Sequence, residues 1–189
     1  MTTKSELREE YIKKRKTISD EFILSAENRV ISLLDAKREK FKDKKIACYW
    51  SIDNEMPTEK LINTFLGMNS EVYLPKIIKN SRMMEFCRLD DYKNLKPNVF
   101  NILEPFETQK IKASDLDIIL LPCVCFDTNG HRIGMGKGYY DHSLVNLVNS
   151  STELIIVAYD FQRVESCFEH KYDIKAHSCV TEKYFYTFN

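Results

Sequence analysis

The chain has 189 residues, and its 28 lysines and arginines are balanced by 28 aspartates and glutamates. This length suits one well-buried domain over residues 1–189, and no Ser-, Gly- or Pro-rich linker divides it. The balanced charge argues against nucleic acid or an anionic membrane as a partner, and no apolar run approaches the length of a membrane span.

Six cysteines are present, but no C-x-x-C pair occurs and the polar N-terminus shows no signal-peptide pattern. We expect reduced thiols of a cytoplasmic protein, buried as small hydrophobic residues. Cys123 and Cys125 form a C-x-C pair, which is a weak zinc signal without a second cluster.

The first predicted element is a helix over residues 4 to about 18, whose apolar residues form one stripe. Lys4, Arg8 and Arg15 lie beside that stripe, where a cleft would meet the core. The lysines between positions 13 and 16 lie further round and are interpreted as solvated. A basic surface helix is the commoner explanation of such a pattern, so the residues alone favour it over a ligand site.

The first predicted strand covers residues 46–50, and Pro57 suits the first turn of the helix that follows. Glu55 therefore lies between the carboxyl end of a strand and a helix, which is the usual ligand position in open α/β sheets. Trp50 at the same edge could stack on a flat ring. An interaction of Glu55 with the next helix and a place for Trp50 in the core are equally acceptable explanations.

The other elements follow the same alternation. A second helix, capped by Ser19 or Asp20, is predicted to run to about residue 41. Residues 89–116 look irregular. Further strands are predicted at residues 72–74, 84–88, 118–121, 154–158 and 179–180. Strands interleaved with helices indicate an α/β fold: a three-layer, Rossmann-like domain with a mostly parallel central sheet.

A glycine-rich stretch lies between Leu121 and Asp141. It holds four of the five glycines, at positions 130, 134, 136 and 138. A buried strand precedes it and a helix is predicted after it, so its backbone N–H groups could bind an anion, most plausibly a phosphate. Arg132 and Lys137 add positive charge, and Asp141 could hold magnesium. Neither the Walker spacing nor the dinucleotide fingerprint is matched, and a tight structural turn is the alternative.

In register, this stretch resembles the central motif of the 5-formyltetrahydrofolate cyclo-ligase (methenyltetrahydrofolate synthetase) family, P-G-x-x-F-D-x-x-G-x-R-L-G-x-G-x-G-Y-Y-D. The matching residues are Pro122, Phe126, Asp127, Gly130, Arg132, Ile133, Gly134, Gly136, Gly138, Tyr139, Tyr140 and Asp141. Outlying matches cover nearly the whole chain: Lys4, Arg8, Glu55, Thr58, Leu74-Pro75, Glu104-Pro105, Ala158-Tyr159, Gln162, Asp173 and Thr181-Glu182.

The resemblance implies ATP-dependent, Mg²⁺-dependent closure of 5-formyltetrahydrofolate to 5,10-methenyltetrahydrofolate, with release of ADP and phosphate. The expected route phosphorylates the formyl oxygen, and N10 attacks the resulting iminium phosphate. A cytoplasmic monomer is expected, and a polyglutamate tail on the folate is left open.

The resemblance also assigns roles, and it reverses the preference for a plain surface helix at Lys4 and Arg8. Expected catalytic residues are Lys137 and Arg132. Expected ATP ligands are Lys4, Arg8, Arg132, Gly134, Met135, Gly136, Lys137, Gly138, Tyr139 and Tyr140. Expected folate contacts are Arg8, Trp50, Glu55 and Tyr139, and expected magnesium ligands are Asp141 and Asp173.

Three residues depart from the family pattern. Cys123 replaces a glycine, Tyr172 replaces a histidine before Asp173, and His177 stands where an acidic residue is common.

Two other functions would keep the glycine loop. A small-molecule kinase on this scaffold would need no folate pocket at Glu55, and a non-catalytic binding protein would tolerate loss of Lys137.

Overall fold

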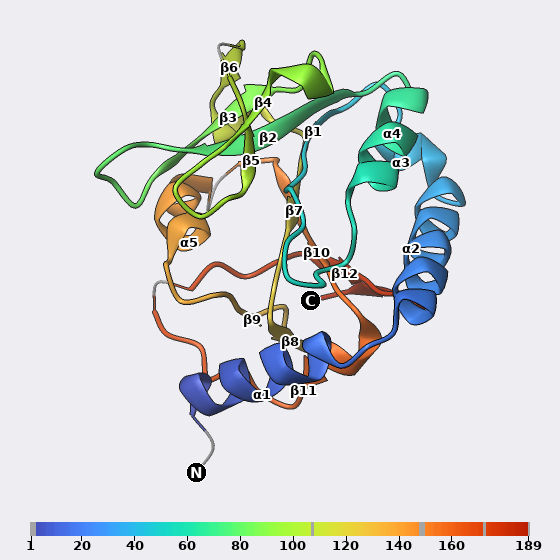
Figure 1. Cartoon of the computed structure of the whole chain (residues 1–189), viewed down its shortest axis with the longest axis vertical. Coiled ribbons are helices and arrows are strands. Elements are labelled where there is room, and N and C mark those ends of the chain that lie inside the picture. Colours follow the sequence, from blue (N-terminus) through green and yellow to red (C-terminus); the bar gives the residue numbers. More distant parts are fainter. Residues whose placement is uncertain (1–2, 107, 148–149, 172, 189) are drawn as a thin grey trace.

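The computed structural model describes residues 3–106, 108–147, 150–171 and 173–188, and its centre is an eight-stranded sheet (Figure 1). In spatial order the strands are β13 (Phe185–Thr187), β12 (Ser178–Val180), β10 (Glu153–Val157), β7 (Ile118–Leu121), β1 (Lys45–Ala47), β2 (Glu71–Ile77), β3 (Met84–Arg88) and β6 (Lys110–Ile111). The five strands from β12 to β2 are parallel, and β13, β3 and β6 add antiparallel edges. The expected α/β fold with a mostly parallel sheet is confirmed.

Alternate residues of β7 bury opposite faces of the sheet, as strand geometry requires. Ile118 and Leu120 pack with α2 (Asp20–Asp35) and α4 (Glu59–Gly67), while Ile119 and Leu121 pack on the side of α5 (Tyr139–Ser143). All four residues are buried because a parallel strand is covered on both faces. Helices α2 and α4 stand together on the right in Figure 1, with α3 (Arg38–Phe41) between them.

A smaller layer lies below the main sheet in Figure 1. Three short strands form it in the order β11 (Arg163–Val164), β8 (Cys125–Asp127) and β9 (Arg132–Ile133). Leu7 and Tyr11 of α1 (Lys4–Lys16) pack against this layer. A separate hairpin pairs β4 (Leu95–Pro97) with β5 (Leu103–Pro105). Single turns of 3₁₀ helix cover Tyr92–Asn94, Ala113–Asp115, Val145–Leu147 and Asp160–Gln162.

The order of the parallel strands creates a switch point. From β1 the chain moves to β2 on one side, whereas β7 pairs with the other side of β1 and leads on to β10 and β12. The connections that leave the carboxyl ends of β1 and β7 therefore run in opposite directions and leave a crevice between them. Open α/β sheets commonly bind their ligands in a crevice of this kind.

The helix predictions hold with shifted boundaries. Ser19 caps α2, because its hydroxyl accepts a hydrogen bond from the Phe22 N–H, but the predicted helix over residues 20–41 is broken after Asp35. Pro57 lies outside α4, whose N-cap is Thr58. The predicted strand over residues 46–50 ends at Ala47, since the chain turns out of the sheet toward the crevice.

The glycine-rich stretch is more structured than a plain loop. It contains the β8–β9 hairpin, in which Cys125 pairs with Ile133. The helix expected after Gly138 lasts only five residues and continues as a 3₁₀ turn, while Val148 lies outside the described residues. The region called irregular holds β4, β5 and β6, whose two- and three-residue strands are too short for periodicity to reveal.

All six cysteines are free and buried, as expected. In the part of the chain that the structure describes, no helix is both long enough and apolar enough to span a bilayer.

Candidate active site

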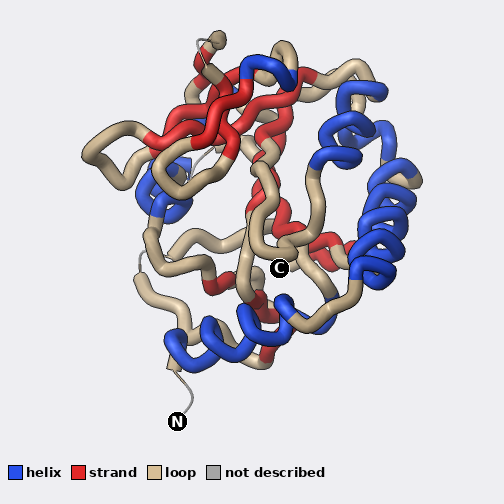
Figure 2. Tube along the Cα trace, in the orientation of Figure 1, coloured by secondary structure: helices blue, strands red, loops and turns tan. Residues whose placement is uncertain are grey.

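A cavity of about 540 Å³ opens at the carboxyl ends of β1 and β7. Its wall combines α1, the loop after β1, the glycine-rich stretch and the β4–β5 hairpin. Figure 2 shows that much of the chain between the sheet and α1 is loop. The predicted site residues all line this cavity: Lys4, Arg8, Trp50, Glu55, Arg132, Gly134, Met135, Gly136, Lys137, Gly138, Tyr139, Tyr140, Asp141 and Asp173.

The β4–β5 hairpin forms one wall of the cavity, and sequence reasoning missed it. Phe100 at its turn meets the Tyr139 ring edge-on, with centroids 6.2 Å apart. Glu104 anchors the hairpin to β2, because its Oε1 accepts from the Ile77 N–H (2.9 Å) and from Asn98 Nδ2 (2.7 Å). In the sequence, buried Glu104 stands out only as a match to the family pattern, whereas the prolines at positions 97 and 105 are typical of short edge strands and could have indicated the hairpin.

Glu55 lies in the wall at the end of β1, with 8% of its surface exposed. One carboxylate oxygen accepts from the Ile52 N–H (3.2 Å), and the other faces Arg15 Nη1 at 3.6 Å. Burial raises the pKa of Glu55 from 4.5 to about 7, and the Arg15 charge opposes that rise. A carboxylate held in this way can accept hydrogen bonds from paired N–H groups of a ligand.

Trp50 was predicted either to stack on a ligand ring or to lie in the core, and its position is intermediate between the two. It is partly buried against the main core and lines the cavity. Its ring meets the edge of Tyr92, with centroids 6.2 Å apart.

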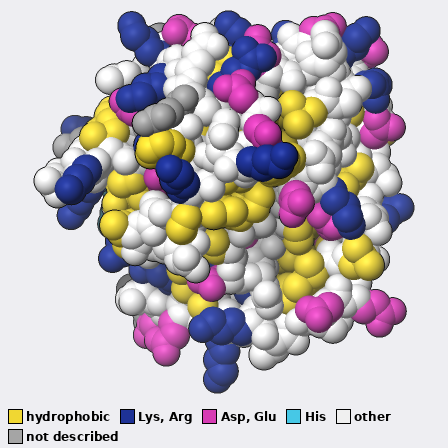
Figure 3. All heavy atoms as spheres, turned by 45° about the horizontal axis from the view of Figure 1, so that its top comes forward, with side chains coloured by type: hydrophobic (Ala, Val, Ile, Leu, Met, Phe, Trp, Pro, Cys, Tyr) yellow, Lys and Arg dark blue, Asp and Glu magenta, His cyan; other side chains and the backbone are white. Residues whose placement is uncertain are grey.

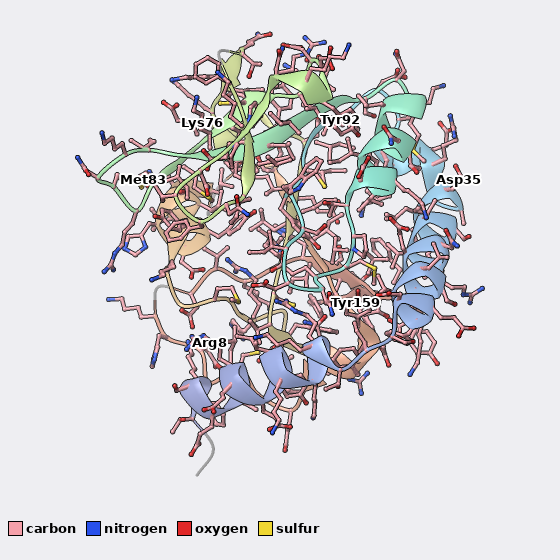
Figure 4. All side chains as sticks on the ribbon, viewed as in Figure 1. Arg8, Asp35, Lys76, Met83, Tyr92 and Tyr159 are labelled. Carbon is pink, nitrogen blue, oxygen red and sulfur yellow. The ribbon has the colours of Figure 1, made fainter. Side chains whose placement is uncertain are left out.

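The glycine loop brings its backbone against α1. Gly136 adopts φ +87°, and a Cβ built on it would lie 3.4 Å from Arg8 Cζ. Arg8 Nε donates to the Gly134 carbonyl at 2.8 Å. In Figure 4, Arg8 lies on α1 at the bottom of the view, whereas Lys76 and Met83 lie on the opposite side of the molecule, at the upper left. An added Cβ would make an ordinary van der Waals contact with Arg8, so it is the positive φ that favours glycine at position 136.

The two predicted catalytic cations, Lys137 and Arg132, differ in how far their side chains are exposed and held by hydrogen bonds. Lys137 is exposed, with Nζ 6.0 Å from the Phe100 ring centroid. Arg132 is buried, and it donates to the Ile174 carbonyl (3.0 Å) and to Asp141 Oδ1 (3.1 Å). Arg132 thus orients Asp141, while Lys137 can move toward a ligand.

Lys4 and Asp173 join the two ends of the chain across the cavity. They form a short salt bridge, and Asp173 also accepts from the His170 N–H at 2.8 Å. Burial is the largest single influence and acts to raise the pKa of Asp173, but the hydrogen bonds from Lys4 and the His170 N–H, together with the Lys4 charge, outweigh it, so the pKa is lowered. Tyr172, whose departure from the family pattern bears on Asp173, lies outside the described residues.

The donor set suits magnesium. Asp141 and Asp173 offer carboxylate oxygens, and Mg²⁺ in proteins is commonly held by one or two carboxylates together with ligand phosphates and water. Both carboxylates are paired with cations, Asp173 with Lys4 and Asp141 with Arg132. The described residues also include a three-residue group of metal-ligating types, Asp127, His131 and Glu169, with neither predicted ligand in it.

The hairpins beside the cavity carry exposed apolar side chains. Figure 3 shows hydrophobic surface gathered on the left of the face turned forward, with lysine and arginine side chains around it. The β2–β3 and β4–β5 hairpins and their flanks expose Ile78, Met83, Val99, Phe100 and Phe106.

Comparison with known proteins supports the motif resemblance. The family model described as "5-formyltetrahydrofolate cyclo-ligase family" matches residues 1–182. A protein from Haemophilus influenzae named 5-formyltetrahydrofolate cyclo-ligase is 37% identical over 134 residues, covering 69% of this chain and 72% of its own length. One of the same name from Escherichia coli K12 is 32% identical over 139 residues, covering 72% and 76%.

The chain belongs to the 5-formyltetrahydrofolate cyclo-ligase family. The expectation of an enzyme of this ligase class is therefore confirmed. Among solved structures, the Aquifex aeolicus 5,10-methenyltetrahydrofolate synthetase superposes with a TM-score of 0.83 at 35% identity, covering 97% of this chain and 92% of that one. A Mycoplasma pneumoniae 5,10-methenyltetrahydrofolate synthetase superposes with a TM-score of 0.78 at 23% identity, covering 96% and 99%, and supports the fold.

Two departures from the cyclo-ligase family motif are harmless to the packing. Cys123 is buried, and its carbonyl accepts from Gln162 Nε2 at 3.0 Å. His177 does not contribute to the cavity wall among the described residues; its Nδ1 accepts from the Leu154 N–H at 2.9 Å. Neither departure removes a charged group from the described lining of the cavity.

Proposed function

We propose that this enzyme cyclises 5-formyltetrahydrofolate to 5,10-methenyltetrahydrofolate, using ATP and Mg²⁺ and releasing ADP and phosphate. One observation carries the proposal: the cations expected at the phosphates and the carboxylate expected at the pterin line a single cavity. Two ligands bound there would face each other across it.

ATP binds on the side of α1 and the glycine loop in this proposal. Lys4, Arg8 and Lys137 supply positive charge, and residues 134–140 supply backbone N–H groups and the close approach that glycine permits. Lys4 must exchange Asp173 for a phosphate oxygen when nucleotide binds. Tyr139 and Tyr140 close the loop end of the site.

The folate binds on the side of β1. Glu55 accepts hydrogen bonds from the amino group and ring N–H of the pterin, while Trp50 and Tyr139 supply flat apolar surface. Arg8 lies between the two ligands, where it can contact either the phosphates or the folate. Tyr139 also touches Phe100, so the β4–β5 hairpin helps to exclude water from the reacting groups.

The reaction needs activation of a formamide, whose oxygen is a poor leaving group. The formyl oxygen attacks the γ-phosphorus, so that an O–P bond forms, the bond to the β-phosphate oxygen breaks and ADP leaves. N10 then attacks the formyl carbon of the iminium phosphate, loses its proton, and phosphate departs with the former formyl oxygen. Lys137 stabilises the charge on the transferring phosphoryl group, and Arg132 holds Asp141 in place.

Asp141 and Asp173 would hold magnesium beside the phosphates. When bound, the ion neutralises charge on the phosphate oxygens and helps to align them. Release of Asp173 from Lys4 by the incoming nucleotide would leave its carboxylate available.

The test follows the near-ultraviolet absorbance of the methenyl product. Purified protein is incubated with 5-formyltetrahydrofolate and MgATP, with either reactant alone, and with ATP plus a magnesium chelator. We expect absorbance to rise only when folate, ATP and magnesium are all present. Absence of an ATP-dependent rise with competent folate would reject the proposal; ADP release without the methenyl band would indicate a kinase instead.

A further inference from the structure

Arg15 is buried deeply for a charged residue, with 1% of its surface exposed near the end of α1. Arginine stays protonated at every pH at which proteins fold, so a buried guanidinium needs an anionic partner or a full set of acceptors. The charge of Arg15 therefore has to be matched inside the protein.

The contacts of Arg15 converge on the cavity wall. Its Nε donates to the Asp53 carbonyl at 2.9 Å, and its Nη1 donates to the Cys123 carbonyl at 3.4 Å. The same Nη1 faces Glu55 Oε1 at 3.6 Å, and that is its ion pair among the described residues. Asp53, Glu55 and Cys123 line the cavity, whereas Arg15 is absent from the described lining.

We propose that Arg15 is a positioning residue for the folate: from behind the wall, its guanidinium holds Glu55 in place and favours its ionised form, which accepts hydrogen bonds. The inference rests on the proposed function, in which Glu55 receives the pterin N–H groups. Because 3.6 Å is an ion-pair distance rather than a hydrogen bond, Arg15 supplies charge without occupying the lone pairs that the ligand needs. The two carbonyl contacts fix the guanidinium in place.

Among the groups around Glu55, Arg15 is the one whose charge favours ionisation of the carboxyl group. Asp53, in the same loop, acts against ionisation, and Arg15 is the nearby cation that favours it. The remaining titratable groups facing Glu55 are neutral near pH 7, because burial raises the pKa of each; these groups are Tyr49, Tyr140, Tyr159 and Cys123. Loss of Arg15 would leave Glu55 mostly protonated at neutral pH, with one oxygen turned from acceptor into donor.

The experiment measures 5-formyltetrahydrofolate binding by titration calorimetry between pH 5.5 and 9, in two buffers of different ionisation enthalpy. In the wild type, affinity should fall as the pH drops through about 7, and binding near pH 7 should release protons. Arg15→Met keeps the length but removes the charge. It should move the midpoint up by about one unit or more and weaken folate binding at pH 7 about five- to tenfold, with MgATP affinity within about twofold.

Two further variants test whether Arg15 acts through Glu55. In Glu55→Gln the pH step should disappear, and adding Arg15→Met should then cost little more folate affinity, since the double-mutant cycle isolates their coupling. Lys14→Met is the matched control, because it removes an exposed cation paired with Glu10 on the same helix. It should leave the midpoint and both affinities unchanged.

An unchanged midpoint in folded Arg15→Met, or an equal loss of folate affinity with and without Glu55, would overturn the inference. Folding is judged by circular dichroism and MgATP binding. If Arg15→Met does not fold, Arg15→Lys decides: it keeps the charge but loses the planar fork, so it should keep the midpoint and bind folate about threefold or more weakly. Wild-type folate binding by Arg15→Lys would equally overturn it. If instead the wild-type protein forms no methenyl product, the proposed function itself fails.

Discussion

At the residue scale, Lys137 combines an exposed side chain with a place in the cavity wall. We expect Lys137→Ala to lower kcat about 100- to 1,000-fold, because a cation aimed at developing charge in a closed site contributes on that order. The unfolding temperature should change by no more than about 2 °C, since no buried contact is lost. Turnover measured by methenyl absorbance checks the first result, and a thermal melt checks the second.

Lys13→Ala is the control for Lys137→Ala, because Lys13 is an exposed lysine on α1 outside the cavity wall. It should leave turnover unchanged. Unimpaired turnover in Lys137→Ala would show that this lysine is only a charge on the loop.

Glu55 makes a second prediction at this scale. Its pKa is about 7 in the folded protein against 4.5 ordinarily, so the folded state holds this proton more tightly. The stabilisation that follows is fully present below about pH 4.5 and is lost as the pH rises through about 7. Relative to Glu55→Gln, the wild-type free energy of unfolding should therefore fall by on the order of 2–3 kcal/mol between pH 4.5 and 8.

Urea unfolding at several pH values measures that difference. Glu55→Gln should also weaken folate binding while MgATP binding is retained. A difference between the two proteins that does not vary with pH would contradict the titration of Glu55, and equal weakening of both ligands would indicate a structural role.

At the element scale, the glycine loop depends on one backbone conformation. Gly136 has φ +87° and lies against Arg8, so Gly136→Ala adds about 1–2 kcal/mol of backbone strain and places a methyl group in contact with the guanidinium. We expect MgATP affinity to fall about tenfold or more, measured by calorimetry, with a small loss of stability. Gly67→Ala is the control, because Gly67 lies in α4 with nothing within 4 Å of an added Cβ. Equal affinity of both variants for MgATP would mean that the loop adapts.

At the scale of the whole molecule, the cavity joins segments that are far apart in the sequence. The salt bridge from Lys4 to Asp173 and the hydrogen bond from Arg8 to Gly134 cross it, and ligands bound there would add to these links. At about 100 times its Kd, MgATP should stabilise the fold by about 2.7 kcal/mol, seen as a raised unfolding temperature. Folate should do the same in the wild type but much less in Glu55→Gln. An unchanged melting temperature with saturating MgATP would contradict a nucleotide site in this cavity.

The amino-acid sequence by itself determined the parts of this protein that are local. The continuous apolar run of β7 predicts a strand buried on both faces, and Ser19 marks a helix start through one hydrogen bond to its own backbone. The glycine spacing between positions 130 and 138 predicts a loop and carries the family motif. Short-range periodicity and turn chemistry suffice for these features.

Only the tertiary structure decided which distant residues meet. The switch between β1 and β7 places Glu55 opposite the glycine loop, and the tiny strands β4 and β5 become a wall because β2 supplies their anchor at Glu104. Arg15 looked like a surface cation on an amphipathic helix, yet packing of α1 against β8 buries it behind Glu55. Such pairings depend on long-range burial and charge, which local pattern does not encode.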